Sequence, residues 1–340
     1  MNNNLIEIIS VAQEITWNSW AVQYFFFIGL SIGGVLLTAP AFLFRKTNWL
    51  PIAKLGLLVA ITTGLVAPVA LLADLHQPAR FYQFYVNFTP TSWMSWGAFL
   101  LPAYLAALSL FGLQALYRDT DGRKPLTRVA ALTTGLLGAG IALYTGSEMG
   151  ILISRVLWQS GWLVSGYLIS GLAGAIGLAL VINSLQSTGN LAISKRLLRW
   201  QSVSLLLTAA WVATWAGAGY LHLSESGATL LRIMVEFRPT ETLAFWIGMG
   251  LLLPLVLTRI NHTGLNFTTG LLAVFGAWML RWVMFIDGQG MPKNGAGFYH
   301  FDLPLATDGL LGILGSVGLW LVILIVIKSL LSQYKHQADV

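Results

Sequence analysis

Nine apolar runs, each close to the length of a membrane-spanning helix, constrain this protein more than any other feature. They lie at Val22–Phe44, Pro51–Ala73, Met94–Tyr117, Leu126–Gly146, Leu163–Leu185, Trp200–Leu221, Leu243–Leu257, Thr268–Ile286 and Gly309–Leu330. A helix needs about 20 apolar residues to cross the hydrocarbon core of a bilayer. Only 9% of the residues are charged, whereas soluble domains carry about 25%. The sequence therefore predicts an all-α integral membrane protein with nine transmembrane helices, or eight if one run is re-entrant.

The distribution of basic residues agrees with nine crossings. If the polypeptide changes side at every run, five of its 19 Lys and Arg residues lie in loops on one side, namely Arg80, Arg155, Arg232, Arg238 and Lys293. Arg281 lies within the eighth run, and the others fall on the opposite side. Basic loops stay in the cytoplasm, so we expect an outer N-terminus and a cytoplasmic C-terminus. This topology accounts for the net charge of +6, which therefore gives no reason to expect a nucleic acid partner.

A weak internal repeat suggests how the spans are grouped. Phe88-Thr89-Pro90-Thr91 resembles Phe237-Arg238-Pro239-Thr240, and His76 and His222 fall at matching ends of spans. We expect one membrane domain over residues 1–340, in which 22–146 and 163–286 are two related four-helix bundles and 309–330 adds a ninth helix. Transporters also contain such repeats, so a secondary transporter is an alternative function. A purely structural membrane anchor is another.

Polar side chains gather near the outer ends of the spans, where they favour a functional site. The candidates are Gln23, Tyr24, Asp74, His76, Tyr144, Glu148 and Arg281. A quinol headgroup needs hydrogen-bonding groups for two oxygens and bases that accept two protons. Each residue also has a structural interpretation: Asp74, for example, would cap a helix or pair with Arg80. Arg281 needs a buried partner, for which Asp74 or Glu148 is expected.

Other redox chemistry is limited by composition. The sequence has no cysteine, which excludes disulfides and iron–sulfur clusters held by thiolates. Its five histidines all lie in loops or at span ends, so we expect no haem and no metal site. Electron transfer therefore needs a mobile carrier and the redox centres of a partner. The outer loops offer a docking surface for such a partner, with Arg80, Phe81, Trp93, Trp96 and Arg155 as candidates, although aromatic residues also form ordinary interfacial belts.

Several segments, in order along the sequence, resemble the NrfD/PsrC family of polytopic membrane subunits. They are Trp17 to Tyr24 with Gly29, Asp74-Leu75-His76-Gln77-Pro78-Ala79-Arg80-Phe81, Pro90-Thr91-Ser92 through Ser95-Trp96-Gly97, Tyr144-Thr145-Gly146, Arg155-Val156-Leu157-Trp158 and Leu280-Arg281-Trp282. Within the family, Trp20 to Gly29 and Thr307-Asp308-Gly309 are similar to the tetrathionate reductase subgroup. The ninth span also suits that subgroup.

The resemblance implies a quinol-oxidising anchor in the bacterial inner membrane with a periplasmic N-terminus. Such a protein takes electrons from menaquinol or ubiquinol and passes them to a periplasmic four-cluster iron–sulfur subunit. A molybdopterin catalytic subunit then reduces tetrathionate or a related sulfur compound. The quinone pocket is implied among the first four helices, with Tyr144 and Tyr24 as contacts and Gln23 and Arg281 nearby. His76, Asp74 and Glu148 are the expected proton acceptors, and His76 stands where some relatives have a carboxylate.

Overall fold

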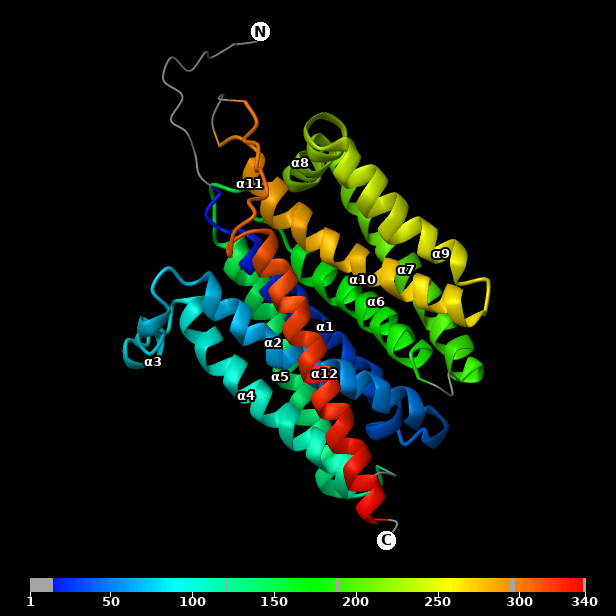
Figure 1. Cartoon of the computed structure of the whole chain (residues 1–340). Helices are drawn as coiled ribbons and strands as arrows, with labels where there is room; N and C mark the ends of the chain where they lie inside the picture. The colour runs from blue at the N-terminus through cyan, green and yellow to red at the C-terminus, as the bar shows by residue number, and fades with distance from the viewer. Residues whose placement is uncertain (1–14, 120–121, 187–189, 294–296, 339–340) are drawn as a thin grey trace.

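A computed structural model describes residues 15–119, 122–186, 190–293 and 297–338. Within these ranges, nine helices are long and apolar enough to cross a membrane, as Figure 1 shows. The nine-span prediction is thus confirmed for the described residues, and the eight-span alternative is wrong. The seventh span is the shortest, as its sequence indicated, and it begins in its polar flank at Thr240.

The spans have the following bounds. They are α1 (Ser19–Phe42), α2 (Leu50–Asp74), α4 (Trp93–Leu113) with η3 (Gln114–Arg118), α5 (Pro125–Gly150), α6 (Trp162–Ser184), α7 (Leu191–Tyr220), η5 (Thr240–Leu252) with α9 (Leu253–Leu257), α10 (Thr263–Trp282) with η6 (Val283–Asp287) and α11 (Gly288–Gly290), and α12 (Leu310–Ala338). Short elements connect them: η1 (Thr47–Trp49), η2 (Pro78–Arg80), α3 (Gln83–Val86), α8 (Glu225–Arg232) and η4 (Ile233–Phe237).

Local chemistry explains where several spans begin. The Asn18 side chain accepts a hydrogen bond from the Trp20 N–H and caps α1, and Asn190 caps α7 in the same way. Pro51 and Pro125 occupy the first turns of α2 and α5, where a missing N–H costs nothing. Such caps matter because the first N–H groups of a helix have no partner within it.

The loops divide between two ends of the bundle. One end, called here the α3 end, carries η2, α3, α8 and the start of α1; the other, the basic end, carries Arg45, Lys46, Lys195 and the end of α12 (Figure 1). The first fourteen residues, for which an outer location was predicted, lie outside the described residues. Which end faces the cytoplasm remains a prediction from the charge distribution.

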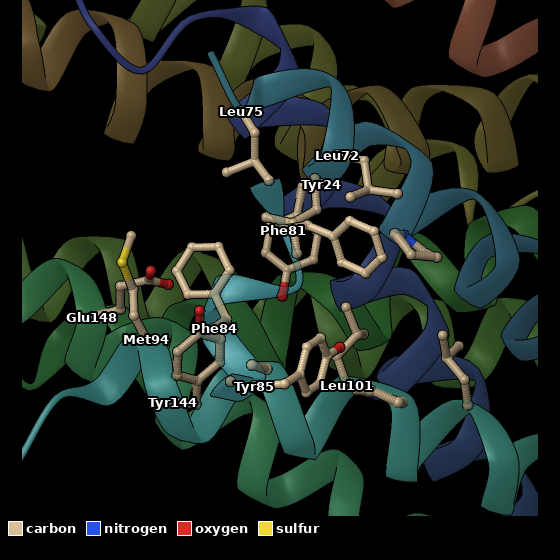
Figure 2. Close-up of a pocket in the computed structure, with 16 residues that line it drawn as sticks. Tyr24, Leu72, Leu75, Phe81, Phe84, Tyr85, Met94, Leu101, Tyr144 and Glu148 are labelled. Carbon is tan, nitrogen blue, oxygen red and sulfur yellow. The ribbon is translucent and has the colours of Figure 1, made fainter. Parts of the chain in front are cut away.

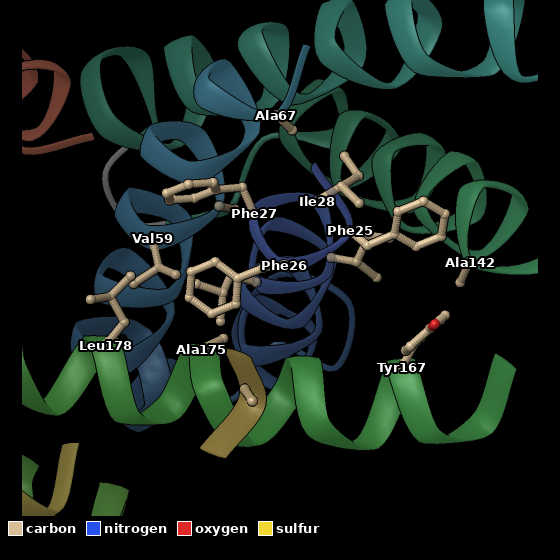
Figure 3. Packing of buried hydrophobic residues seen from close by; sticks show 14 of the residues in the cluster. Phe25, Phe26, Phe27, Ile28, Val59, Ala67, Ala142, Tyr167, Ala175 and Leu178 are labelled. Carbon is tan, nitrogen blue, oxygen red and sulfur yellow. The ribbon is translucent and has the colours of Figure 1, made fainter. Parts of the chain in front are cut away.

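Helices α1 and α6 pack together at the centre of the molecule. Helices α2, α4 and α5 lie with α1 on one side, whereas α7, η5 and α10 lie with α6 on the other. The relation of the two groups by an internal repeat remains a prediction. Figure 3 shows aromatic side chains of α1, including Phe25, Phe26 and Phe27, filling the space toward α2, α5 and α6.

The central contact depends on glycines. A side chain on Gly33 would collide with the backbone of Gly171 on α6, and one on Gly171 would collide with the backbone of Gly29. Small residues at these positions let two helix backbones approach closely, which is how helices in lipid gain packing energy. The bulky aromatic residues of α1 therefore stand beside this contact and not within it.

Arg281 is buried against the same contact. Its Nη1 donates to Ser170 Oγ (2.6 Å) and to the Ala277 carbonyl (2.9 Å), and its Nη2 donates to the Tyr167 carbonyl (3.0 Å). A methyl group on Gly29 would overlap Nη2. The predicted pairing of Arg281 with Asp74 or Glu148 is wrong, because carbonyl and hydroxyl oxygens of α6 and α10 accept its hydrogen bonds.

Helix α12 packs along the outside of the bundle. Only 17% of its most apolar stretch is buried within the protein. It is held by a hydrogen bond from Gln23 to Ser316 and by one from Trp320 Nε1 to Thr62 Oγ1 (3.2 Å). The rest of its surface is therefore available to lipid.

We predict that Gly33→Ala destabilises the bundle by about 1–3 kcal/mol, the usual cost of overpacking. The neighbouring backbone of α6 has no side chain that can move away. Gly135→Ala is the matched control, since a methyl group there meets no atom within 4 Å. Thermal unfolding of the purified protein in detergent measures both variants. Equal midpoints for the two would contradict the close contact between α1 and α6.

Candidate functional site

A cavity of about 270 Å³ lies at the α3 end between α1, α2, α4 and α5. Its lining is mostly apolar and comprises Tyr24, Pro68, Leu71, Leu72, Leu75, Phe81, Phe84, Tyr85, Met94, Gly97, Ala98, Leu101, Pro102, Leu105, Tyr144 and Glu148. Ligand sites are commonly apolar cavities with a few well-placed polar groups. The arrangement therefore suits a flat, largely apolar molecule with a polar end.

Three side chains supply the buried polar groups of the cavity. Tyr24 is 2% exposed and Glu148 is 8% exposed. Tyr144 and Glu148 are one helical turn apart on α5 and form a hydrogen bond with each other. The hydroxyl of Tyr24 has no hydrogen-bond partner among the described residues. Since buried hydroxyls are nearly always paired, a ligand that hydrogen-bonds to Tyr24 would complete the site. Figure 2 shows Tyr144 and Glu148 together at the cavity.

Gly97 makes room for Tyr144. A side chain at position 97 of α4 would collide with the phenol ring. The segment Ser95-Trp96-Gly97 is part of the family resemblance in the sequence, and the collision gives its glycine a physical role. Without the glycine, Tyr144 could not stand against α4 at the edge of the cavity.

Two further titratable groups connect the cavity to the surface. Asp74, at the end of α2, is half-buried and accepts a hydrogen bond from the backbone N–H of Ala21. This contact also satisfies one of the free N–H groups at the start of α1. Asp74 interacts electrostatically with both Glu148 and His76, and His76 is exposed. The predicted proton acceptors thus form a series from the cavity to solvent.

Aromatic residues of the α2–α4 connection cover the cavity. Phe81 and Phe84 line it directly, as Figure 2 shows. Tyr85 stacks edge-to-face on Phe99 of α4, with ring centroids 5.5 Å apart, and Phe88 packs in the same way on Trp96 at 5.4 Å. Phe81, expected only as a docking residue, is therefore also part of the cavity wall.

The other docking candidates differ in exposure. Arg80, Trp93 and Trp96 are exposed at the α3 end. Arg155, in contrast, donates from Nη1 to the carbonyl oxygens of Gln289 (2.7 Å) and Met291 (3.1 Å). Burial lowers the pKa of its guanidinium. The structure thus uses Arg155 to hold the end of the eighth span and leaves little of it for a partner.

Two predicted ligand contacts lie away from the cavity. Gln23 accepts a hydrogen bond from Trp278 Nε1 (2.7 Å) and donates to Ser316, so its amide connects α1 to α10 and α12. Arg281 points into the contact between α1 and α6. Neither lines the cavity, and their assignment to it is corrected for that reason. The sequence reasoning also missed Phe84, Tyr85 and the leucines of α2.

A second buried carboxyl lies at the same end in the other group of helices. Asp287 is 1% exposed, and one of its oxygens has no hydrogen-bond partner among the described residues. It interacts electrostatically with Arg238 and Glu241, which pair with each other at 2.9 Å. Each group of four spans therefore ends in a buried carboxyl, Glu148 on α5 and Asp287 in η6.

The fold and the cavity define a multi-pass integral membrane protein with a small-molecule site near one membrane face. The protein belongs to the NrfD family, because residues 8–293 match the family model described as "Polysulphide reductase, NrfD". It is 33% identical to a membrane-family relative from Salmonella typhimurium, a subunit of tetrathionate reductase, over 340 aligned residues that cover 98% of this sequence and 97% of the relative. A polysulfide reductase component of Wolinella succinogenes is 25% identical over 81% of this sequence and 95% of its own length. A selenate reductase subunit from Mesobacillus selenatarsenatis is 25% identical over 84% of this sequence and 75% of its own length.

We predict that Gly97→Ala displaces Tyr144 and lowers stability by about 1–3 kcal/mol through overpacking. Adding Tyr144→Ala should cancel most of this loss relative to Tyr144→Ala alone, because the colliding ring is gone. Gly140→Ala, where a methyl group makes an ordinary 3.5 Å contact with Leu100, is the control. The measurement is a double-mutant cycle of unfolding midpoints. Additive losses would show that Gly97 does not act through Tyr144.

Proposed function

We propose that this protein is the membrane subunit of a reductase complex and oxidises menaquinol or ubiquinol in the cavity at the α3 end. The observation that carries the proposal is an apolar cavity whose buried polar groups are the unpartnered Tyr24 hydroxyl and the Tyr144–Glu148 pair, within the described residues. The names of the relatives, which are subunits of tetrathionate, polysulfide and selenate reductases, agree with it.

The cavity offers what a quinol needs for binding. Pro102 and Leu105 of α4, with Pro68 of α2, extend its wall from Glu148 toward the middle of the membrane. An isoprenoid tail would lie along these residues, in contact with lipid. The ring would then stand between the aromatic residues of the α2–α4 connection and Tyr24, with one oxygen near Glu148 and Tyr144.

The proton chemistry follows from the same positions. Oxidation of a quinol releases two electrons and two protons. Glu148, as a carboxylate, accepts a proton from the quinol hydroxyl while Tyr144 holds the oxygen. Asp74 then receives the proton and His76 gives it to water, since Asp74 interacts electrostatically with both neighbours. The same route serves the second proton after Glu148 has been emptied.

The two electrons need an acceptor outside this protein, which has no cysteine to hold a cluster. We infer that a periplasmic four-cluster iron–sulfur subunit docks at the α3 end and passes them to a molybdopterin subunit. The exposed Trp93, Trp96 and Arg80 stand beside the cavity and suit this contact. Tetrathionate is the favoured final acceptor, on the basis of the 33% identical relative. The α3 end then faces the periplasm of a bacterial inner membrane.

The alternatives are less well supported. A structural anchor needs neither a cavity nor an unpartnered hydroxyl inside it. A secondary transporter places its substrate site near the membrane midplane between broken helices, whereas this cavity lies at one end of the spans.

We predict distinct effects for substitutions in the cavity. Tyr144→Phe should weaken binding of a fluorescent menaquinol analogue about tenfold, the value of one hydrogen bond to a charged group. Glu148→Gln should lower quinol-linked turnover by about 10²–10⁴, as expected for loss of a general base, while analogue binding changes less. Binding is measured on the purified protein, and turnover on membranes that contain the complex.

Tyr220→Phe is the control, because this tyrosine is exposed at the same end of the bundle. Reduction of the terminal acceptor by an artificial dye should stay normal in all variants, since dye electrons enter the partner subunits directly. Unchanged binding and turnover in both Tyr144→Phe and Glu148→Gln would remove the quinol site from this cavity.

A further inference from the structure

A second cavity, of about 480 Å³, lies at the basic end of the bundle, opposite the one described above. It is enclosed by α2, η3, α6, α7 and α12, through Pro51, Lys54, Leu55, Leu58, Leu116, Asn183, Gln186, Ile193, Lys328, Leu331 and Ser332. It is larger than the first cavity and more polar. Nothing in the proposed quinol chemistry uses it.

The charged groups at this cavity are both cationic. Lys54 lies in the first turns of α2, and Lys328 lies near the end of α12. Asn183 and Gln186 add amide groups, and no acidic side group is among the described residues that line the cavity. Lys54 already makes a contact within the protein, but an ammonium group has three donors. The cavity therefore favours an anionic ligand.

The apolar part of the wall indicates what else the ligand carries. Leu55 and Leu58 continue α2 from Lys54 toward the middle of the membrane, and Leu116 stands on η3. Two cations at the level of the membrane surface above an apolar wall match the order of groups in a phospholipid. A free phosphate ion would use the lysines but gain nothing from the leucines.

We propose that this cavity binds an anionic phospholipid, with its phosphate between Lys54 and Lys328 and its acyl chains along Leu55 and Leu58. Basic pockets between transmembrane helices on the cytoplasmic side bind anionic headgroups of this kind. The lipid would connect α12, whose surface is mostly outside the protein interior, to α2, α6 and α7. The proposal does not depend on quinol oxidation.

The test uses the full-length protein in mild detergent, freed of lipid and titrated with phosphatidylglycerol under native mass spectrometry. We expect one tightly bound phosphatidylglycerol and much weaker binding of phosphatidylcholine with the same acyl chains. The double variant Lys54→Gln, Lys328→Gln should weaken the tight binding about thirtyfold, the change that about 1 kcal/mol for each lysine implies.

The double variant Lys46→Gln, Lys195→Gln is the matched control. It removes the same charge at the same end from exposed positions that do not line the cavity, and it should bind like the wild type. Lys328→Gln alone, at an exposed residue, serves if the double variant does not fold. Equal weakening in the control, or equal binding of phosphatidylcholine, would overturn the proposal. Displacement of the lipid by millimolar inorganic phosphate would assign the site to a soluble anion instead.

Discussion

The close contact between α1 and α6 is the constraint on which the remaining structure depends. Gly33 and Gly171 bring two backbones together in a way that no larger residue permits. Arg281 then fills the adjoining space and donates to oxygens of α6 and α10. In lipid there is no water to satisfy a guanidinium, so these protein oxygens must do so. The two groups of helices are thereby fixed against each other at one place.

The position of the cavity follows from this contact. Helix α1 presents its other side to α2 and α5, so that Tyr24 forms the back wall and the start of the helix meets Asp74. Gly97 brings α4 close enough to hold Tyr144 at the edge. The aromatic residues of the α2–α4 connection complete the enclosure by packing on α4. The site is therefore assembled from four helices, and its cover comes from the loop that carries the docking candidates.

The sequence predicted the spans well because their signals are simple. Apolar length and the sidedness of Lys and Arg are both readable without knowing which helices touch. Tyr24, Tyr144 and Glu148 were found because they stand at span ends, where polar groups are unusual. Which side of a helix they occupy was not readable in the same way.

Gln23 illustrates this limit. It precedes Tyr24 by one residue, and one residue turns a helix by about 100°. Helix α1 is apolar around its whole circumference, so no amphipathic pattern indicates which side meets the cavity. Gln23 therefore points to α10 and α12 while Tyr24 points to the cavity. Arg281 was misassigned for a different reason, since its partners are mainly backbone carbonyls, which every residue has.

The placement of the cavity, Asp74 and His76 at one end of the spans has an energetic consequence. If quinol is oxidised there, its protons leave at the same end at which its electrons pass to the partner. No charge then crosses the hydrocarbon core during turnover, and the membrane potential does no work on the reaction. The step would be electroneutral, so its rate would not depend on how strongly the membrane is energised.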